Sequence, residues 1–152
     1  MRRHASPQAL LVEPELERRK LFTAALAAVA YVCAPADFVT ARRSLSTARY
    51  DLLVANIRLG AYNGLHLVYL ARDTDTRSVL YADDDDLFLA RTAQAAGAFY
   101  ERSGRVSIAL PGYVIRALPP SDRRDPAVVD RRCTVIFRGG RRSADTGAGL
   151  IM

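Results

Sequence analysis

Short apolar runs alternate with longer amphipathic segments along most of the chain. Residues 10–12 form an apolar run that ends at Glu13-Pro14, and this pattern predicts a first strand. Because proline suits the first turn of a helix, the segment that follows, residues 15–30, is predicted to be helical. The apolar side chains of that helix fall within an arc of about 140°, which predicts one buried face; they are Leu16, Phe22, Leu26 and Val29.

The alternation then repeats four times. A run that is apolar at every position, residues 52–55, is typical of a strand covered by helices on both faces. Glycine marks two boundaries, since Asn63-Gly64 is a turn signal and Gly97 ends the helix before it. Further strands are predicted at residues 31–34, 78–82 and 99–101, and further helices at residues 37–49 (apolar at Phe38, Val39 and Leu45), 65–72, 83–96 and 106–118.

Strands that alternate with helices in this way predict an α/β domain with a parallel sheet. The composition changes after residue 118, where Arg, Asp, Gly and Pro become frequent, so residues 119–152 are predicted to be a mostly irregular tail. Within that tail, residues 133–137 (CTVIF) are β-prone. They could add to a sheet edge or contact a partner, or they could pack loosely on the domain.

The stretch YDLLVANIRLGAYNGLHL, residues 50–67, resembles the centre of a bacterial response-regulator receiver domain. The end of the fourth predicted helix, around Gly97, matches that family as well. The resemblance covers residues 8–118. It implies a flavodoxin-like, doubly wound fold with five parallel strands in the order 2-1-3-4-5 and a pocket at the carboxyl ends of strands 1, 3 and 4.

The residue at the family's phosphoacceptor position is Asn56, five residues after Asp51. In the family an aspartate there takes a phosphoryl group from a histidine kinase. A carboxylate oxygen can attack phosphorus, whereas an amide nitrogen has its lone pair delocalised into the carbonyl group. The resemblance therefore implies a receiver-like chain without its phosphoacceptor, an atypical or pseudo-receiver.

Other positions of the implied pocket differ from the family too. The two acids that hold Mg²⁺ at the end of the first strand match Glu13 and Pro14, and proline offers no oxygen ligand from its side chain. We therefore expect weak or absent Mg²⁺ binding; the alternative for Glu13 is a solvated acid at a helix N-terminus. Tyr81 stands where the family has Thr or Ser. Its ring could fill the pocket, its hydroxyl could bond Asn56 or Glu13, or it could be a half-buried strand aromatic.

The family's lysine lies at the end of the fifth strand. An alignment gap of two residues places Arg102 at its position, and a gap of one residue places Ser103 there. The proline that follows the lysine in the family is missing. The degenerate phosphorylation pocket is thus predicted to comprise Glu13, Pro14, Asn56, Tyr81 and Arg102. With these changes we expect no catalytic residue, no metal site and no cofactor, and we expect that the protein is not an enzyme. We hypothesise a phosphorylation-independent, receiver-like signalling module in the cytoplasm that acts by protein–protein interaction.

The family's partner face is formed by the fourth helix, the fifth strand and the fifth helix. By resemblance, a protein partner or a second copy of the chain would contact this face; the predicted contact residues are Leu87, Phe88, Arg91, Phe99, Tyr100 and Val106.

The chain of 152 residues carries a net charge of +6. Lys20 is the only lysine, and the remaining basic residues are arginines, a bias that a GC-rich genome explains more simply than phosphate recognition. The alternative function is a nucleic-acid-associated regulator that uses the Arg-rich tail. Residues 121–152 hold seven arginines against four aspartates, so this alternative is not favoured.

Four further possibilities receive little support from the residues. Binding of FMN needs a cradle of backbone N–H groups, and the acidic, proline-containing loop VEPELE is a poor one. The aspartates at residues 83–86 suit a helix N-terminus better than a metal site. Cys33 and Cys133 lack metal-ligand spacing, and no apolar run is long enough to span a membrane.

Overall fold

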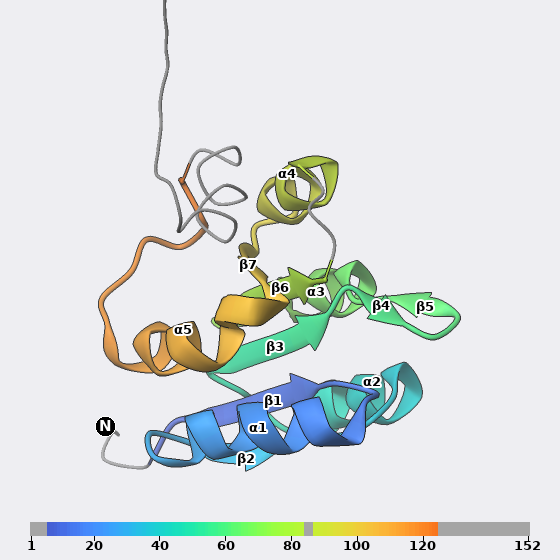
Figure 1. Cartoon of the computed structure of the whole chain (residues 1–152), viewed down its shortest axis with the longest axis vertical. Helices are drawn as coiled ribbons and strands as arrows, with labels where there is room; N and C mark the ends of the chain where they lie inside the picture. The colour runs from blue at the N-terminus through green and yellow to red at the C-terminus, as the bar shows by residue number, and fades with distance from the viewer. Residues whose placement is uncertain (1–5, 84–86, 125–152) are drawn as a thin grey trace, which may run out of the picture.

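The computed structural model describes residues 6–83 and 87–124. Its main sheet contains five parallel strands in the order β2-β1-β3-β6-β7, which confirms the order that the resemblance implied (Figure 1). Strand β3 lies at the centre, so its neighbours on both sides complete its hydrogen bonds. The strands are β1 (Gln8–Val12), β2 (Tyr31–Cys33), β3 (Leu52–Asn56), β6 (Arg77–Ala82) and β7 (Phe99–Arg102).

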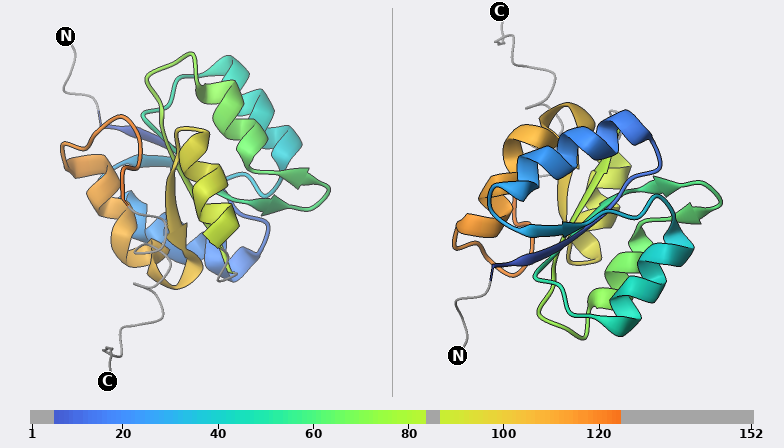
Figure 2. Two further views of the ribbon diagram at one scale, coloured as in Figure 1. Left: turned by 90° about the horizontal axis from the view of Figure 1, so that it is seen from above. Right: turned by 90° about the horizontal axis from the view of Figure 1, so that it is seen from below.

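Helices cover both faces of this sheet. Figure 2 shows α1 (Leu16–Ala27) and α5 (Ser103–Ile115) side by side on one face. The opposite face is covered by α2 (Phe38–Thr47), α3 (Leu65–Ala71) and α4 (Leu87–Ala95). The flavodoxin-like, doubly wound architecture predicted from the sequence is therefore confirmed.

Alternate residues of each central strand enter two separate hydrophobic clusters. In β1, Leu10 and Val12 pack under α2, α3 and α4, whereas Ala9 and Leu11 pack under α1 and α5. Every residue of β3 is buried, as its continuous apolar sequence predicted. Because burying one large apolar side chain contributes about 1.5–3 kcal/mol, these two clusters are the main source of stability.

Side chains and one glycine fix the helix ends. The Glu15 carboxylate caps α1 by accepting from the backbone N–H groups of Glu17 and Arg18 at 3.2 and 3.1 Å. At the end of α4, Gly97 has φ +92°, and the N–H groups of Gly97 and Ala98 donate to the carbonyls of Gln94 and Ala93 at 3.0 Å each. This paired closure of a helix with a left-handed glycine is a Schellman motif, so the predicted role of Gly97 is correct.

Several details of the predicted helices are wrong. Leu16 and Val39 are 51% and 43% exposed, because each lies in the first turn of its helix and points away from the sheet. Pro14 precedes the capping residue Glu15 and so lies outside α1. Helix α5 begins at Ser103 and ends at Ile115, whereas residues 106–118 were predicted.

A small hairpin that the sequence reading missed projects beside the carboxyl edge of the sheet. Its strands, β4 (Arg58–Leu59) and β5 (Tyr62–Asn63), pair antiparallel, and Gly60 turns between them with φ +66°. The predicted turn at Asn63-Gly64 is confirmed, since Gly64 lies in a turn directly before α3. Gly64 is the N-cap of α3 with φ −57°, and the Asn63 side chain accepts from the N–H of Leu65 at 2.8 Å.

Parts of two predictions lie outside the described residues. Of the acidic run at residues 83–86, only Asp83 is described, and residues 125–152, which include Cys133 and the segment 133–137, are likewise outside. Residues 116–124 are described and contain no helix or strand. Asp122 and Arg124 nevertheless bond to strand β7, so the packed unit extends beyond residue 118, where the tail was predicted to begin.

Replacement of Gly64 by alanine should destabilise the protein by about 2–3 kcal/mol, because the new Cβ would lie 2.5 Å from the carbonyl oxygen of Asn56. Chemical denaturation of the variant measures the loss. Gly104→Ala is the matched control, since no atom lies within 4 Å of the position of its Cβ, and it should be neutral or slightly stabilising. Equal stability of the two variants would contradict the role assigned to Gly64.

Candidate functional site

Three polar side chains meet at the carboxyl edge of the sheet. Glu13 directly follows β1, Asn56 is the last residue of β3, and Tyr81 of β6 lies opposite Asn56 in the strand register. Parallel strands present their carboxyl ends at one edge of a sheet, which is why residues so distant in sequence converge. All three are buried, with exposed fractions of 1%, 8% and 0%.

The carboxylate of Glu13 is the centre of this cluster. Its Oε1 accepts from the hydroxyl of Tyr81 at 2.5 Å and from Nδ2 of Asn56 at 3.2 Å. Its Oε2 accepts from the backbone N–H of Glu15 at 2.9 Å. The alternative of a solvated acid is therefore wrong: Glu13 is a buried carboxylate whose charge is stabilised by donors from three elements.

The amide of Asn56 uses both of its ends. Nδ2 donates to Glu13, while Oδ1 accepts from the backbone N–H of Arg58 at 2.9 Å. An ionised aspartate of the same shape could still accept from Arg58, but it could not donate to Glu13. The geometry therefore requires an amide at this position, where it joins the start of the β4–β5 hairpin to Glu13.

Tyr81 fills the space beside Glu13. Its ring packs edge-on against Phe22 of α1, with a centroid distance of 5.2 Å, and its hydroxyl donates to Glu13. Burial, together with the negative charge of Glu13, raises the pKa of Tyr81 well above its usual range. The phenol consequently keeps its proton and remains a donor. Of the alternatives left open by the sequence, the bond from the hydroxyl to Glu13 is the one observed, while the ring is fully buried in the cluster that contains Phe22.

One member of the site was missed by the sequence reading. Nη1 of Arg18 lies 3.8 Å from Oε1 of Glu13, and its Nη2 lies 3.1 Å from a carboxylate oxygen of Asp83. The guanidinium thus links α1 to the loop after β6 and contributes positive charge at the mouth of the pocket. Its position in the first turn of the helix that follows β1 is the only hint that the sequence offers.

Pro14 and Arg102 do not join the buried cluster. Pro14 is exposed and carries no polar side-chain atom. Arg102 is the last residue of β7 and pairs in register with Ala82, whereas Ser103 is the first residue of α5. Arg102 therefore stands at the end of its strand, where the resemblance expects the lysine; whether it takes that role stays a prediction.

The residues present do not fit a magnesium ion. The described residues include no group of three or more His, Cys, Asp or Glu side chains that could hold a metal. Glu13 is the single acid of the cluster, and each of its oxygens already accepts a hydrogen bond. Because Mg²⁺ demands near-octahedral oxygen coordination, the family's metal chemistry has no support in this geometry.

A second buried polar network lies at the outer edge of β7. Arg124 binds Asp122 through Nε at 2.8 Å and Nη2 at 2.6 Å, and reaches Glu101 through Nη1 at 3.2 Å. The hydroxyl of Tyr113 also donates to Glu101. Burial raises the pKa of Asp122, but hydrogen bonds from Arg124 outweigh it, so the net pKa lies below its usual value.

This network also satisfies the open edge of the sheet. The backbone N–H of Tyr100 donates to Asp122 at 3.2 Å, and the carbonyl of Tyr100 accepts from Arg124 at 2.8 Å. An unpaired edge strand is a template for pairing with another chain. The segment after α5 therefore protects β7 with side chains in place of a further strand, which the irregular sequence did not reveal.

The predicted partner face is only partly exposed. Phe88 is 70% exposed, Arg91 is exposed and Leu87 is half-buried. The prediction is wrong for Phe99, Tyr100 and Val106, which are 5%, 0% and 0% exposed. Their side chains belong to the two cores, so they cannot be reached by a partner.

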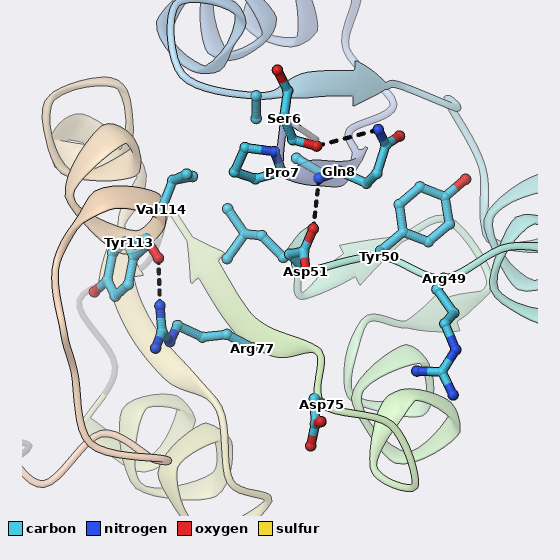
Figure 3. A pocket seen from close by; sticks show the side chains of 13 residues that line it. Ser6, Pro7, Gln8, Arg49, Tyr50, Asp51, Asp75, Arg77, Tyr113 and Val114 are labelled. Carbon is cyan, nitrogen blue, oxygen red and sulfur yellow. Dashed lines mark hydrogen bonds between the residues drawn. The ribbon is translucent and has the colours of Figure 1, made fainter. Parts of the chain in front are cut away.

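A cavity of about 660 Å³ opens at the opposite, amino-terminal edge of the sheet (Figure 3). A carboxylate oxygen of Asp51 accepts from the backbone N–H of Gln8 at 2.8 Å, and Arg77 donates to the carbonyl of Tyr113 at 2.6 Å. These contacts join the starts of β1 and β3 and hold α5. Asp51, which opens the receiver-like stretch, thus has a structural reason to be present.

Comparison with solved structures identifies the fold. The response regulator DrrB of Thermotoga maritima matches with a TM-score of 0.65 and 14% identity over 73% of this chain and 54% of that one. The signal receiver domain of a LuxO repressor protein from Vibrio parahaemolyticus matches with a TM-score of 0.64 and 15% identity, over 73% of this chain and 92% of that one. The chemotaxis response regulator CheY4 of Vibrio cholerae matches with a TM-score of 0.59 and 16% identity, over 72% of this chain and 99% of that one.

These likenesses show that the chain has the receiver-domain fold. It spans about half of the DrrB chain and nearly all of the two single-domain structures. No protein-family model matches the chain, and no curated protein matches it significantly.

Asn56→Asp should destabilise the protein by about 2–4 kcal/mol near pH 8, because two carboxylates would then share one buried site. One of the pair must hold a proton in the folded state, at a pH where it is ionised in the unfolded chain. The stability of the variant should therefore fall as the pH rises from about 5 to about 8. Urea unfolding across this range measures it.

Asn63→Asp is the matched control for this experiment. Asn63 is exposed and only accepts a hydrogen bond at the N-terminus of α3, a place where a carboxylate is favourable. We expect that variant to be as stable as the original. An Asn56→Asp protein with undiminished, pH-independent stability would contradict the donor role of the amide.

Arg124→Met should destabilise the protein by about 2–3 kcal/mol at neutral pH, since Glu101 and Asp122 would lose their buried partner. The pKa of Asp122 is lowered in the folded state, so its contribution is present above about pH 4 and is lost as the pH falls. The difference between the two proteins should therefore shrink below about pH 4. Arg123→Met, at an exposed neighbouring position, should change stability by less than about 0.5 kcal/mol.

Proposed function

We propose that the protein is a phosphorylation-independent, receiver-like signalling module that acts by protein–protein interaction. The observation that carries this proposal is that both carboxylate oxygens of Glu13 already accept hydrogen bonds. The donors are Tyr81, Asn56 and the N–H of Glu15. The fold is that of proteins described as response regulators and signal receiver domains. The single acid of this cluster is occupied by hydrogen bonds from the chain's own groups, which supports a protein that does not use phosphoryl transfer.

Phosphoryl transfer has no nucleophile in this pocket. Asn56 replaces the aspartate of the family, and its amide nitrogen already donates to Glu13. Glu13 itself is 1% exposed and accepts from the hydroxyl of Tyr81, so an incoming phosphate donor would have to break the cluster to reach it. The same geometry supports a protein without catalytic residues, cofactor or metal.

Contact with other proteins is supported by apolar side chains left on the surface. Phe88 on α4 and Ile108 and Ile115 on α5 are 70%, 72% and 68% exposed. Both helices contact the edge strand β7, and exposed large apolar side chains on such helices are available to a partner. We infer that Leu87, Phe88 and Arg91 are contact residues for a protein partner or for a second copy of the chain.

The proposal includes a location in the cytoplasm. Among the described residues, none of the helices has the length and apolar character needed to cross a bilayer. A cytoplasmic location rests on the receiver resemblance. The alternative of a nucleic-acid-associated regulator depends on arginines in residues 125–152, outside the described residues, and no described feature favours it.

Incubation with acetyl phosphate and Mg²⁺, followed by intact-mass measurement, tests the central claim. We expect no acid-stable, base-labile phosphoryl adduct, since the pocket holds no free carboxylate. A receiver domain that keeps its aspartate, treated in parallel, is the positive control. Asn56→Asp alone should also remain unlabelled, because Pro14 and Tyr81 are unchanged. A stoichiometric adduct on the original chain would overturn the proposal.

A further inference from the structure

A groove of about 520 Å³ runs between α5 and the segment that follows it. In Figure 1 this segment, drawn in orange, leaves the end of α5 and turns back toward β7. Its contacts with Tyr100 hold it there and leave a hollow along one side of the helix. Apolar side chains in the lining come from both walls: Ile108 and Ala109 from α5, and Leu118 and Pro119 from the segment.

The helix side that faces the groove has a simple pattern. Arg105, Ala109, Gly112 and Arg116 are spaced by four, three and four residues, so they follow one line along α5. The small residues in the middle make the hollow, and the arginines stand at its two ends, about 16 Å apart along the helix axis. Arg116 folds back over the groove, with its guanidinium carbon 3.6 Å from where a Cβ on Gly112 would stand.

The charges of the groove are unbalanced. Arg124 is occupied by Glu101 and Asp122. Arg105, Arg116 and Arg123 line the same groove and form no ion pair among the described residues. The Nε atom of Arg105 is also buried without a hydrogen-bond partner in that part of the chain. A buried donor without an acceptor is rare and indicates a missing partner atom.

We infer that this groove, which we call the α5 groove, binds an acidic, amphipathic peptide segment of a partner protein. Its apolar side chains would seat on Ala109, Leu118 and Pro119 beside the exposed Ile108, and its carboxylates would pair with Arg105 and Arg116. Guanidinium–carboxylate pairs are bidentate and charge-assisted, which gives them geometric specificity. The inference rests on the proposed protein-interaction function and names the chemistry of the partner.

Charge decides between the possible occupants. A second copy of the chain carries a net charge of +6, so it would bring positive charge to a positive groove. Residues 125–152 contain five arginines and three aspartates, so the chain's own continuation is no better matched. An acidic segment from another protein is the occupant that complements three arginines around an apolar floor.

Labelled synthetic peptides test this assignment by fluorescence anisotropy with the full chain. The probe is a helical peptide with leucines on one face and glutamates beside them; two relatives of equal length replace every Glu by Lys or every Leu by Ser. We expect the acidic amphipathic peptide to bind and each relative to bind at least about tenfold more weakly. Failure of the acidic peptide to bind at all would overturn the inference.

Variants locate the binding on the protein. Arg105→Gln with Arg116→Gln should weaken binding about tenfold or more, whereas Arg43→Gln with Arg49→Gln removes the same charge from exposed positions elsewhere and should change it little. Gly112→Leu should also abolish binding, because it fills the groove without altering charge and keeps the helix. Equal losses in the groove and control variants would show a general charge effect and refute the groove.

Two further outcomes separate this inference from its premise. Binding of a labelled single-stranded oligonucleotide that competes with the peptide and is lost in the groove variants would assign the arginines to nucleic acid and overturn the inference. Peptide binding that persists in Gly112→Leu would place the contact elsewhere and leave the proposed function standing. A phosphoryl adduct in the mass experiment would instead remove the proposed function, whatever the peptides do.

Discussion

The burial of one carboxylate, that of Glu13, governs the carboxyl edge of the sheet. A charge at 1% exposure is stable only when donors surround it, and here they come from Tyr81, Asn56 and the backbone of Glu15. Each donor belongs to a different part of the chain, so the ends of β1, β3 and β6 are fixed relative to one another. The need for donors around Glu13 explains the amide of Asn56 and the phenol of Tyr81. The receiver resemblance implies an aspartate and a Ser or Thr at these two positions.

The far side of the sheet shows the same principle at its edge. Strand β7 pairs with β6 on one side only, and on its outer side the backbone groups of Tyr100 bond to Asp122 and Arg124. Because Arg124 also pairs with Glu101, these contacts fix the segment after α5 against β7. The α5 groove exists only because that segment is fixed beside the helix.

The network around Glu13 and the network around Arg124 have different consequences for the molecule. The position that performs chemistry in related folds is closed by internal hydrogen bonds, so it contributes stability. The surface next to β7 carries three arginines that form no ion pair among the described residues, together with the exposed Ile108 of α5, and the proposed recognition would take place there. Under the proposed function, the amount of a partner would set the activity of the protein.

Periodicity in the sequence determined the order of strands and helices, because alternate burial on a sheet and one-sided burial on a helix leave regular patterns. The resemblance to receiver domains, which implied the strand order, placed Glu13, Asn56 and Tyr81 together at one edge of the sheet. The exposure of Leu16 and Val39, the burial of Phe99 and Val106, the bridge made by Arg18 and the docking of Arg124 were decided by tertiary structure. These depend on the direction in which a side chain points and on contacts between distant segments, and neither leaves a local pattern.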